Sequence, residues 1–187
     1  TRYSVKVVDL PAQISSIDLS KGVQQTLDRI DQLMSTWRSD SELSQFNQAP
    51  VGEWFPLSAE TIEVLELALK VAKETQGSFD ITVPPLVNLW GFGPQDFNAG
   101  HFNQSVPNNA AIEVAKSKVG YQQINIDKKR QQVIKKAERI IDLSAIAKGY
   151  AVDKVAAYLD GLGSEHYLVE VGGEIRVKGH KADGSHW

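Results

Sequence analysis

The chain has 187 residues, with 20 Lys and Arg against 23 Asp and Glu, which gives a formal net charge of −3. That length is enough for one domain with a real core, and the slightly acidic, ordinary composition points away from a nucleic-acid partner. The lack of cysteine excludes a disulfide framework, a thiolate zinc site and a cysteine nucleophile.

Local sequence patterns predict three elements in the first part of the chain. Apolar and polar residues alternate over Tyr3–Val7, which predicts a half-buried strand. From about Asp18 to Met34, apolar residues recur at spacings of three and four, which predicts an amphipathic helix. Ser41 is expected to cap a short helix through Phe46, because its hydroxyl can accept from a free amide of the first turn.

The middle of the chain combines a helix with an unusual stretch of aromatic, glycine and proline residues. Ser58 is expected to cap a helix that stops at Gly77, since glycine favours helix ends. Pro84-Pro85 permits a short helix, because proline is tolerated in a first turn. The polar run from Pro94 to about Pro107 is a candidate insertion or mobile lid.

The second half alternates short strands with two helices. Helices are predicted over about 109–119 and 148–159, and a short strand over 140–141. Two hairpins are predicted, one over 124–134 with its turn at two lysines, and one over 167–177 with its turn at two glycines. This order indicates an α+β fold, with a mixed, largely antiparallel sheet flanked by helices. We expect residues 1–187 to form a single domain.

The most informative stretch is IDLSAIAKGYAVD, residues 141–153. It reads as the end of a buried strand, a tight turn with Asp142 and Ser144, and a helix start with Lys148. Free amides and the positive dipole end of a helix favour a phosphate, and a nearby lysine adds a cation. The spacing differs from a Walker A loop. Many such turns carry no ligand, so the residues alone leave phosphate binding and a plain structural turn both open.

Other segments have two interpretations each. Trp37 in a polar stretch can stack on a flat ring or cover the edge of the core. Asp80 can accept hydrogen bonds from a ring or hold its own loop. Gly172-Gly173 lets a backbone approach a ligand or simply turns the chain. Together these residues suit a ligand with one flat ring system and phosphates.

Several common catalytic patterns are missing. The four histidines are scattered, and HExxH and Gly-x-Ser-x-Gly are absent. Gly91-Phe92-Gly93 begins like a dinucleotide fingerprint but lacks the third glycine, so a Rossmann oxidoreductase is not expected.

Four segments resemble, in order, the signature blocks of the ApbE-type flavin transferases. They are MSTWRSDSELSQFN (34–47), GSFDITVPPLVNLWGFG (77–93), IDLSAIAKGYAVD (141–153) and YLVEVGGEIRVKG (167–179). The blocks extend over most of the chain, and none is a generic motif. The resemblance implies an ApbE-like fold related to the T-fold.

The resemblance also implies an activity. Members of this family take FAD as donor and move its FMN part onto a threonine hydroxyl of a target protein, releasing AMP with the help of Mg²⁺. The implied acceptors are flavin-bearing subunits of membrane redox pumps. The implied location is the bacterial periplasm, with a lipid anchor in the inner membrane outside this sequence. Two alternatives stay open: an FAD carrier without catalysis, and an FAD pyrophosphatase that yields FMN and AMP.

The resemblance assigns roles to single residues. The positions matched to FAD contacts are Trp37, Ser78, Phe79, Asp80, Asp142 and Lys148. Ala145 matches a position whose backbone carbonyl binds the metal, and a carbonyl oxygen suits hard Mg²⁺. Bound at the pyrophosphate, Mg²⁺ would neutralise the charge that builds up as AMP leaves.

The sequence departs from the family pattern at both ends. The family opens with Met-Gly-Thr, and Thr1 matches only its threonine. The blocks that carry the remaining metal ligands are not present before Trp187. We therefore expect a flavin-transferase domain truncated at both ends, with the catalytic residues beyond Trp187 and weak activity of this part alone.

Overall fold

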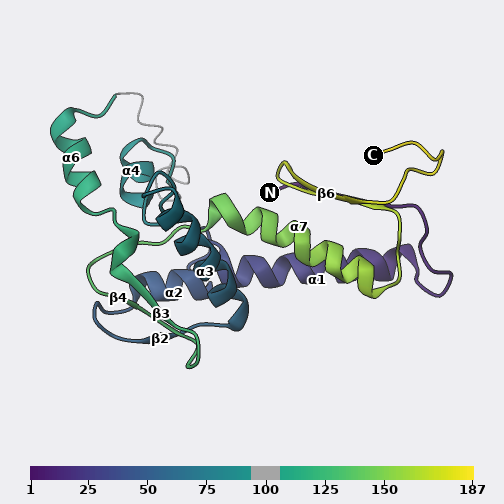
Figure 1. The fold of residues 1–187 in the computed structure, drawn as a ribbon, viewed down its shortest axis with the longest axis horizontal. Helices are drawn as coiled ribbons and strands as arrows, with labels where there is room; N and C mark the ends of the chain where they lie inside the picture. The colour runs from purple at the N-terminus through teal and green to yellow at the C-terminus, as the bar shows by residue number, and fades with distance from the viewer. Residues whose placement is uncertain (94–105) are drawn as a thin grey trace. The chain divides into compact units, whose positions relative to one another are not determined.

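The computed structural model describes residues 1–93 and 106–187, which fall into two compact units (Figure 1). The terminal unit comprises Thr1–Asp31 and Ala145–Trp187, and the central unit comprises Gln32–Ser144. The polar loop predicted from Pro94 to Pro107 lies outside the described residues as far as position 105. Whether the whole chain is one domain stays a prediction.

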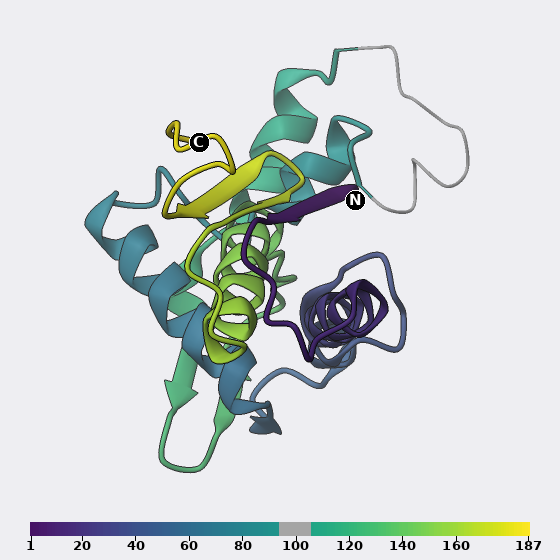
Figure 2. The same ribbon diagram turned by 90° about the vertical axis from the view of Figure 1, so that its right-hand side faces the viewer.

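The terminal unit combines an antiparallel sheet with two helices. Its elements are β1 (Tyr3–Val7), α1 (Ser16–Met34, through Asp31), α7 (Ser144–Gly161, from Ala145), β5 (Tyr167–Val171) and β6 (Glu174–Lys178). The strand order is β1-β5-β6, and both neighbouring pairs are antiparallel. Every second residue of β5 is buried, as expected for a strand with one covered face. Figures 1 and 2 show α7 running alongside this sheet.

Polar contacts hold α7 to the β5–β6 hairpin. The buried Tyr167 hydroxyl donates to Asp160 at 3.0 Å, and Asp160 also pairs with Lys178 at 3.0 Å. The Lys178 ammonium lowers the pKa of Asp160 against the opposing effect of burial. Arg176 and Asp153 form a second pair at 2.7 Å. Because these ion pairs are exposed to solvent, they contribute little stability and mainly orient the two elements.

The central unit contains short helices and a second small sheet. Its elements are α2 (Glu42–Gln48), β2 (Phe55–Pro56), α3 (Ala59–Glu74), α4 (Pro84–Leu89), α6 (Asn109–Ser117), the 3-10 helix η1 (Tyr121–Gln123), β3 (Ile124–Asp127) and β4 (Gln132–Lys135). The strand order is β2-β4-β3, with antiparallel pairing. The core is apolar, and its largest fully buried side chains are Leu43, Phe46, Val64, Leu65, Ile81, Val133, Ile141 and Leu143.

Most of the predicted elements are confirmed, together with the α+β class. Ser41 and Ser58 cap α2 and α3 as expected, since each hydroxyl accepts from the amide three residues on. The described strands form two separate sheets rather than one, because each hairpin pairs with a different third strand, β1 or β2. The two-residue strand β2 was too short to produce an alternating pattern.

The predicted strand at Ile140-Ile141 is wrong. Ile141 is fully buried but makes no strand pairing, because a side chain, that of Asn47, binds both of its backbone polar groups. The helix predicted from Lys148 begins earlier, at Ser144. None of the helices in the described ranges is long and apolar enough to span a membrane.

Candidate ligand-binding site

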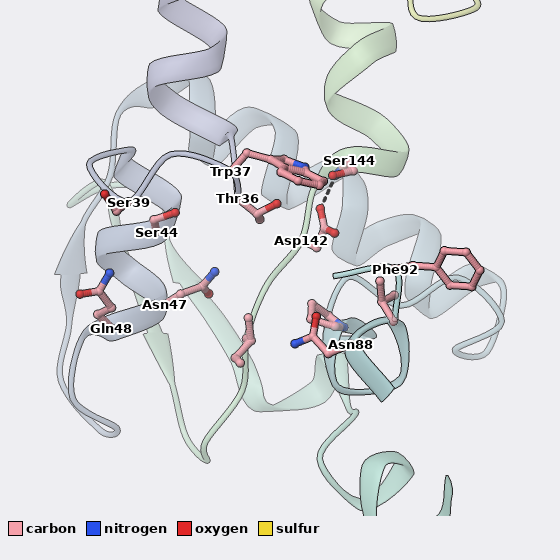
Figure 3. A pocket seen from close by; sticks show the side chains of 13 residues that line it. Thr36, Trp37, Ser39, Ser44, Asn47, Gln48, Asn88, Phe92, Asp142 and Ser144 are labelled. Carbon is pink, nitrogen blue, oxygen red and sulfur yellow. Dashed lines mark hydrogen bonds between the residues drawn. The ribbon is translucent and has the colours of Figure 1, made fainter. Parts of the chain in front are cut away.

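A cavity of about 690 Å³ opens in the central unit (Figure 3). Its walls come from the loop after α1, from α2 and α4, and from the segment before α7. The polar lining residues are Thr36, Ser39, Ser44, Asn47, Gln48, Asn88, Asp142 and Ser144, and the apolar ones are Trp37, Pro84, Val87, Phe92 and Ile140. Both the size and the mixture of apolar walls with a few polar groups are typical of small-molecule sites.

Trp37 supplies the large flat surface of this cavity. Its side chain lines the cavity and remains 51% exposed. Figure 3 shows it among the side chains that line the cavity. An indole that is half open to solvent offers a stacking face for an aromatic ring. The sequence also allowed Trp37 to cover the edge of the core. A tryptophan in that role would not need so much of its side chain exposed to solvent.

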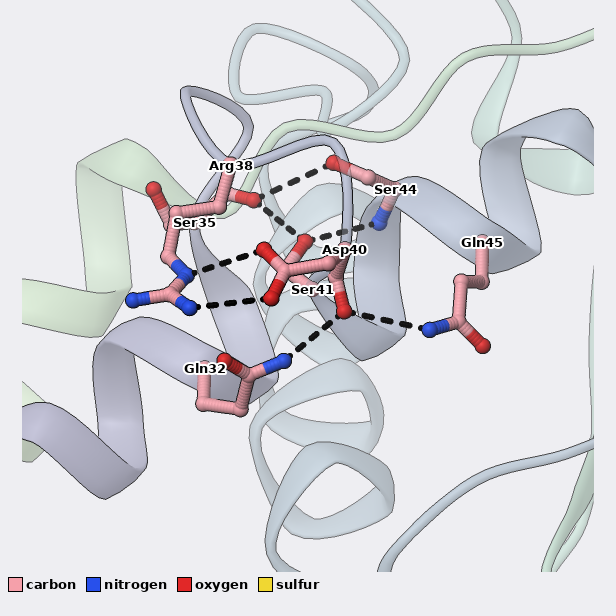
Figure 4. A network of polar contacts seen from close by, with 7 residues as sticks. All are labelled: Gln32, Ser35, Arg38, Asp40, Ser41, Ser44 and Gln45. Atoms are coloured by element: carbon pink, nitrogen blue, oxygen red, sulfur yellow. Dashed lines mark hydrogen bonds and ion pairs between the residues drawn. The ribbon is translucent and has the colours of Figure 1, made fainter.

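The loop that carries Trp37 is held by a polar network (Figure 4). Arg38 donates from Nε and Nη2 to the two carboxylate oxygens of Asp40, at 3.1 and 3.0 Å. This guanidinium lowers the pKa of Asp40, although partial desolvation of the carboxylate opposes the shift. The backbone carbonyl of Asp40 accepts from the side-chain amides of Gln32 at 2.7 Å and Gln45 at 3.1 Å. Two helices therefore fix the loop from either side.

The same loop is tied to the start of α2 by serines. The carbonyl of Ser35 accepts from the hydroxyls of Ser41 at 2.6 Å and Ser44 at 3.2 Å. The Ser41 oxygen in turn accepts from the Ser44 amide at 3.0 Å. Ser41 and Ser44 are both buried, and a buried hydrogen-bond network of this kind restricts conformations. The backbone on either side of Trp37 is therefore held in place.

Asp142 lies on the wall of the same cavity. It comes just before α7, in agreement with the turn and helix predicted from the sequence. One carboxylate oxygen accepts from the Ser144 amide at 2.7 Å (Figure 3). The amide of Asp142 donates to the carbonyl of Ile81 at 2.8 Å. The carboxylate is thus held at the start of α7, where it binds an amide that has no acceptor within the helix.

Ser78, Phe79 and Asp80 do not line the cavity. They follow α3, and the Asp80 carboxylate accepts from the amide and hydroxyl of Thr82 and from the amide of Tyr121, at 2.7, 2.6 and 3.0 Å. These contacts agree with the second interpretation of Asp80 from the sequence, in which its carboxylate stabilises its own loop. A role of the three residues in binding FAD stays a prediction.

Lys148 and Ala145 belong to the terminal unit. The Lys148 ammonium donates to the carbonyl of Gly172 at 3.3 Å and lies 3.9 Å from Glu174. Gly172 has φ of +59°, and a Cβ there would come within 2.9 Å of the Lys148 side chain. Lys148 and the turn at Gly172 are therefore neighbours. Only glycine fits at position 172, because a side chain there would be strained and would clash with Lys148. Ala145 is exposed in the first turn of α7.

The described residues do not by themselves fit a Mg²⁺ ion. Within residues 1–93 and 106–187, no group of three or more His, Asp or Glu side chains is arranged to hold a metal. The carbonyl of Ala145 would supply one oxygen ligand, and Mg²⁺ requires six. The other protein ligands would have to come from outside this part of the chain.

The sequence reasoning missed several cavity residues, among them Asn47, Asn88 and Phe92. All three lie inside the segments 34–47 and 77–93 that carry the family resemblance. Figure 3 shows Asn47 on α2 and Asn88 on α4. The only signal was their place inside these segments, since an asparagine or a phenylalanine in a sequence does not show which cavity it will line.

The chain is similar in sequence to curated proteins from bacteria. It is 39% identical to the FAD:protein FMN transferase of Vibrio cholerae, over 100% of this chain and 54% of that protein. It is 37% identical to the FAD:protein FMN transferase of Haemophilus influenzae, again over 100% of this chain and 54% of that protein. The chain therefore spans about half the length of the curated relatives it matches.

Solved structures agree with this similarity. The flavin transferase ApbE from Vibrio cholerae superimposes with a TM-score of 0.91 at 39% identity, covering 99% of this chain and 58% of that one. The apo form of the Pseudomonas stutzeri flavinyl transferase ApbE gives a TM-score of 0.87 at 35% identity, covering 99% and 60%. The profile of the ApbE family matches residues 1–187 in full. The chain therefore belongs to the ApbE family.

Proposed function

We propose that the protein containing this chain transfers FMN from FAD to a threonine hydroxyl of a target flavoprotein and releases AMP. The observation that carries this proposal is the cavity in which Trp37 and Asp142 lie together. An exposed indole beside a carboxylate and a helix start suits a flat heterocycle followed by phosphates. The family membership and the names of the curated relatives point to the same substrate.

The proposed transfer exchanges one phosphorus–oxygen bond for another. The threonine oxygen forms a bond to the phosphorus of the FMN half of FAD. The bond from this phosphorus to the bridging oxygen of the pyrophosphate breaks, and AMP leaves with the electron pair. The threonine proton passes to solvent or to a base outside the residues described here. Negative charge on the leaving AMP must be stabilised for this step to be fast.

Residues of this chain are proposed to bind and orient FAD. Trp37 stacks on a ring of the dinucleotide, and the Asp142 carboxylate accepts a hydrogen bond from a ring N–H or a hydroxyl. Lys148 provides a cation for a phosphate oxygen. Ser78, Phe79 and Asp80 are proposed to contact FAD through the loop after α3.

The remaining parts of the proposal come from the family. We propose that the reaction depends on Mg²⁺, with the Ala145 carbonyl as one ligand and the others outside this chain. The proposed acceptors are flavin-bearing subunits of membrane redox pumps. The proposed location is the periplasm, with a lipid anchor in the inner membrane.

The binding step is tested by replacing Trp37 in the full-length protein. Trp37→Ala is expected to weaken FAD binding by about tenfold, because base–aromatic stacking contributes roughly 1–3 kcal/mol. Flavin fluorescence titration measures this. Trp54→Ala is the matched control, since Trp54 is a comparably exposed tryptophan of the central unit that does not line the cavity. Equal losses in both variants would contradict the proposed site.

The reaction itself is tested with full-length protein, FAD, Mg²⁺ and a threonine-containing acceptor domain. Mass spectrometry of the acceptor should show an added FMN, and chromatography should show one AMP for each FMN transferred. Free FMN and AMP with an unmodified acceptor would indicate a pyrophosphatase instead. Tight FAD binding without FMN or AMP would indicate a carrier. Either of these results would overturn the transferase proposal.

A further inference from the structure

The side chain of Asn47 binds both backbone polar groups of a single residue, Ile141. Its Oδ1 accepts from the Ile141 amide at 2.8 Å, and its Nδ2 donates to the Ile141 carbonyl at 2.9 Å. Exchanging the amide oxygen and nitrogen would break both hydrogen bonds, so the network defines the orientation of the side chain. The side chain of Asn47 on α2 thus makes the two backbone hydrogen bonds to Ile141 that a neighbouring β-strand would otherwise make.

This pairing fixes the residue that precedes Asp142. The Ile141 side chain is fully buried, and the next amide, that of Asp142, donates to the carbonyl of Ile81 at 2.8 Å. Two consecutive residues therefore have their backbones held from different elements. With the backbone fixed, the Asp142 side chain can reach the Ser144 amide at 2.7 Å and face the cavity.

Asn47 is itself held in place at the end of α2. Its carbonyl accepts from the ammonium of Lys135 at 2.6 Å, and Lys135 is only 4% exposed. A cation at a helix C-terminus is favourable, because the last carbonyls lack helical partners. The helix end therefore cannot shift easily relative to β4, and the Asn47 amide keeps a defined position.

We infer that Asn47 is a positioning residue for the ligand site: by clamping Ile141 it sets the place and direction of the Asp142 carboxylate. The inference rests on the proposed function for its ligand, a flavin nucleotide. The geometric part concerns only this chain and does not depend on the ligand. Asn47 also lines the cavity, so the alternative is that it binds the ligand independently of Asp142.

The geometric part is tested by hydrogen exchange of the full-length protein without FAD. In Asn47→Ala, the amides of Ile141, Asp142 and Ser144 should exchange at least about tenfold faster, because local opening becomes easier. Asn47→Asp keeps the acceptor but loses the donor, and it should give a smaller increase even if the alanine variant folds poorly. Unchanged exchange at these amides in both variants would overturn the inference.

Asn108→Ala is the matched control for this experiment. Asn108 caps α6 by accepting from the Ala111 amide at 2.9 Å, and it does not line the cavity. Removing it should cost some stability while leaving exchange at residues 141–144 unchanged. Faster exchange there in the control would mean that any general destabilisation loosens the segment, which would also overturn the inference.

The functional part is tested by a double-mutant cycle on FAD affinity. Asn47→Ala should weaken FAD binding by about tenfold in the wild-type background and much less in the Asp142→Ala background, since residues that act through each other are not additive. Additive losses would show that Asn47 acts independently and would overturn the inference. If the wild-type protein binds no FAD, the proposed function fails, and hydrogen exchange alone decides the role of Asn47.

Discussion

Lys135 shows how one buried charge affects the central unit. Its ammonium donates to the Asn47 carbonyl and lies 5.6 Å from the centre of the Phe46 ring. Burial lowers the pKa of Lys135, with Glu138 opposing this shift. A lowered pKa in the folded state means that the unfolded chain holds this proton more tightly, so folding disfavours the charged form.

Stability should therefore rise as Lys135 loses its proton. Between the lowered folded pKa and the ordinary lysine value, the free energy of unfolding of the wild type should increase with pH relative to that of Lys135→Met. Urea unfolding at a series of alkaline pH values measures the difference. Lys129→Met, which removes an exposed lysine from the β3–β4 turn, controls for the loss of one charge. A pH-independent difference between wild type and Lys135→Met would contradict this account.

At the scale of elements, Thr82 joins two loops of the central unit. Its side chain is fully buried, donates to Asp80 at 2.6 Å, and accepts from the Gly120 amide at 2.7 Å. The Asp80 carboxylate also accepts from the Tyr121 amide. The loop after α3 is therefore tied to the chain between α6 and β3 through one hydroxyl and one carboxylate.

A matched pair of substitutions tests this connection. Thr82→Val keeps the shape but leaves the Gly120 amide without its acceptor, so we expect a loss of about 1–3 kcal/mol in the free energy of unfolding. Thr82→Ser keeps the hydroxyl and removes one methyl group, which should cost about 1 kcal/mol. Denaturant unfolding of both variants gives the comparison. A serine variant as unstable as the valine variant would show that packing, and not the hydrogen bonds, holds the loops.

At the scale of the whole molecule, the two units differ in how the chain builds them. The central unit is one continuous segment, Gln32–Ser144, whereas the terminal unit needs residues from both ends of the chain. The central unit has its own sheet, its own apolar core and every described residue that lines the candidate cavity. These are the features of a segment that can fold independently.

We expect a polypeptide of residues 32–144 to unfold cooperatively when heated, as followed by circular dichroism. The corresponding polypeptide of residues 145–187 lacks β1 and α1 of its unit and should show no such transition, since an isolated hairpin and helix bury too little surface. A gradual, non-cooperative loss of signal from residues 32–144 would show that its core depends on the terminal unit.

Elements whose signals are local could be predicted from the order of residues alone. The caps at Ser41 and Ser58, the stripe of α1 and the hairpins depend on neighbouring residues, and the structure confirms them. The resemblance of four segments was likewise enough to predict the ApbE family, which the family profile confirms.

Contacts between residues far apart in sequence became visible only in the folded chain. It brought Trp37 and Asp142 to one cavity and paired Asn47 with Ile141, 94 residues away. It also showed that Ile140-Ile141 is not a strand. An apolar pair looks the same in sequence whether a strand or a side-chain amide binds its backbone. The partner is chosen by long-range packing, which local patterns do not record.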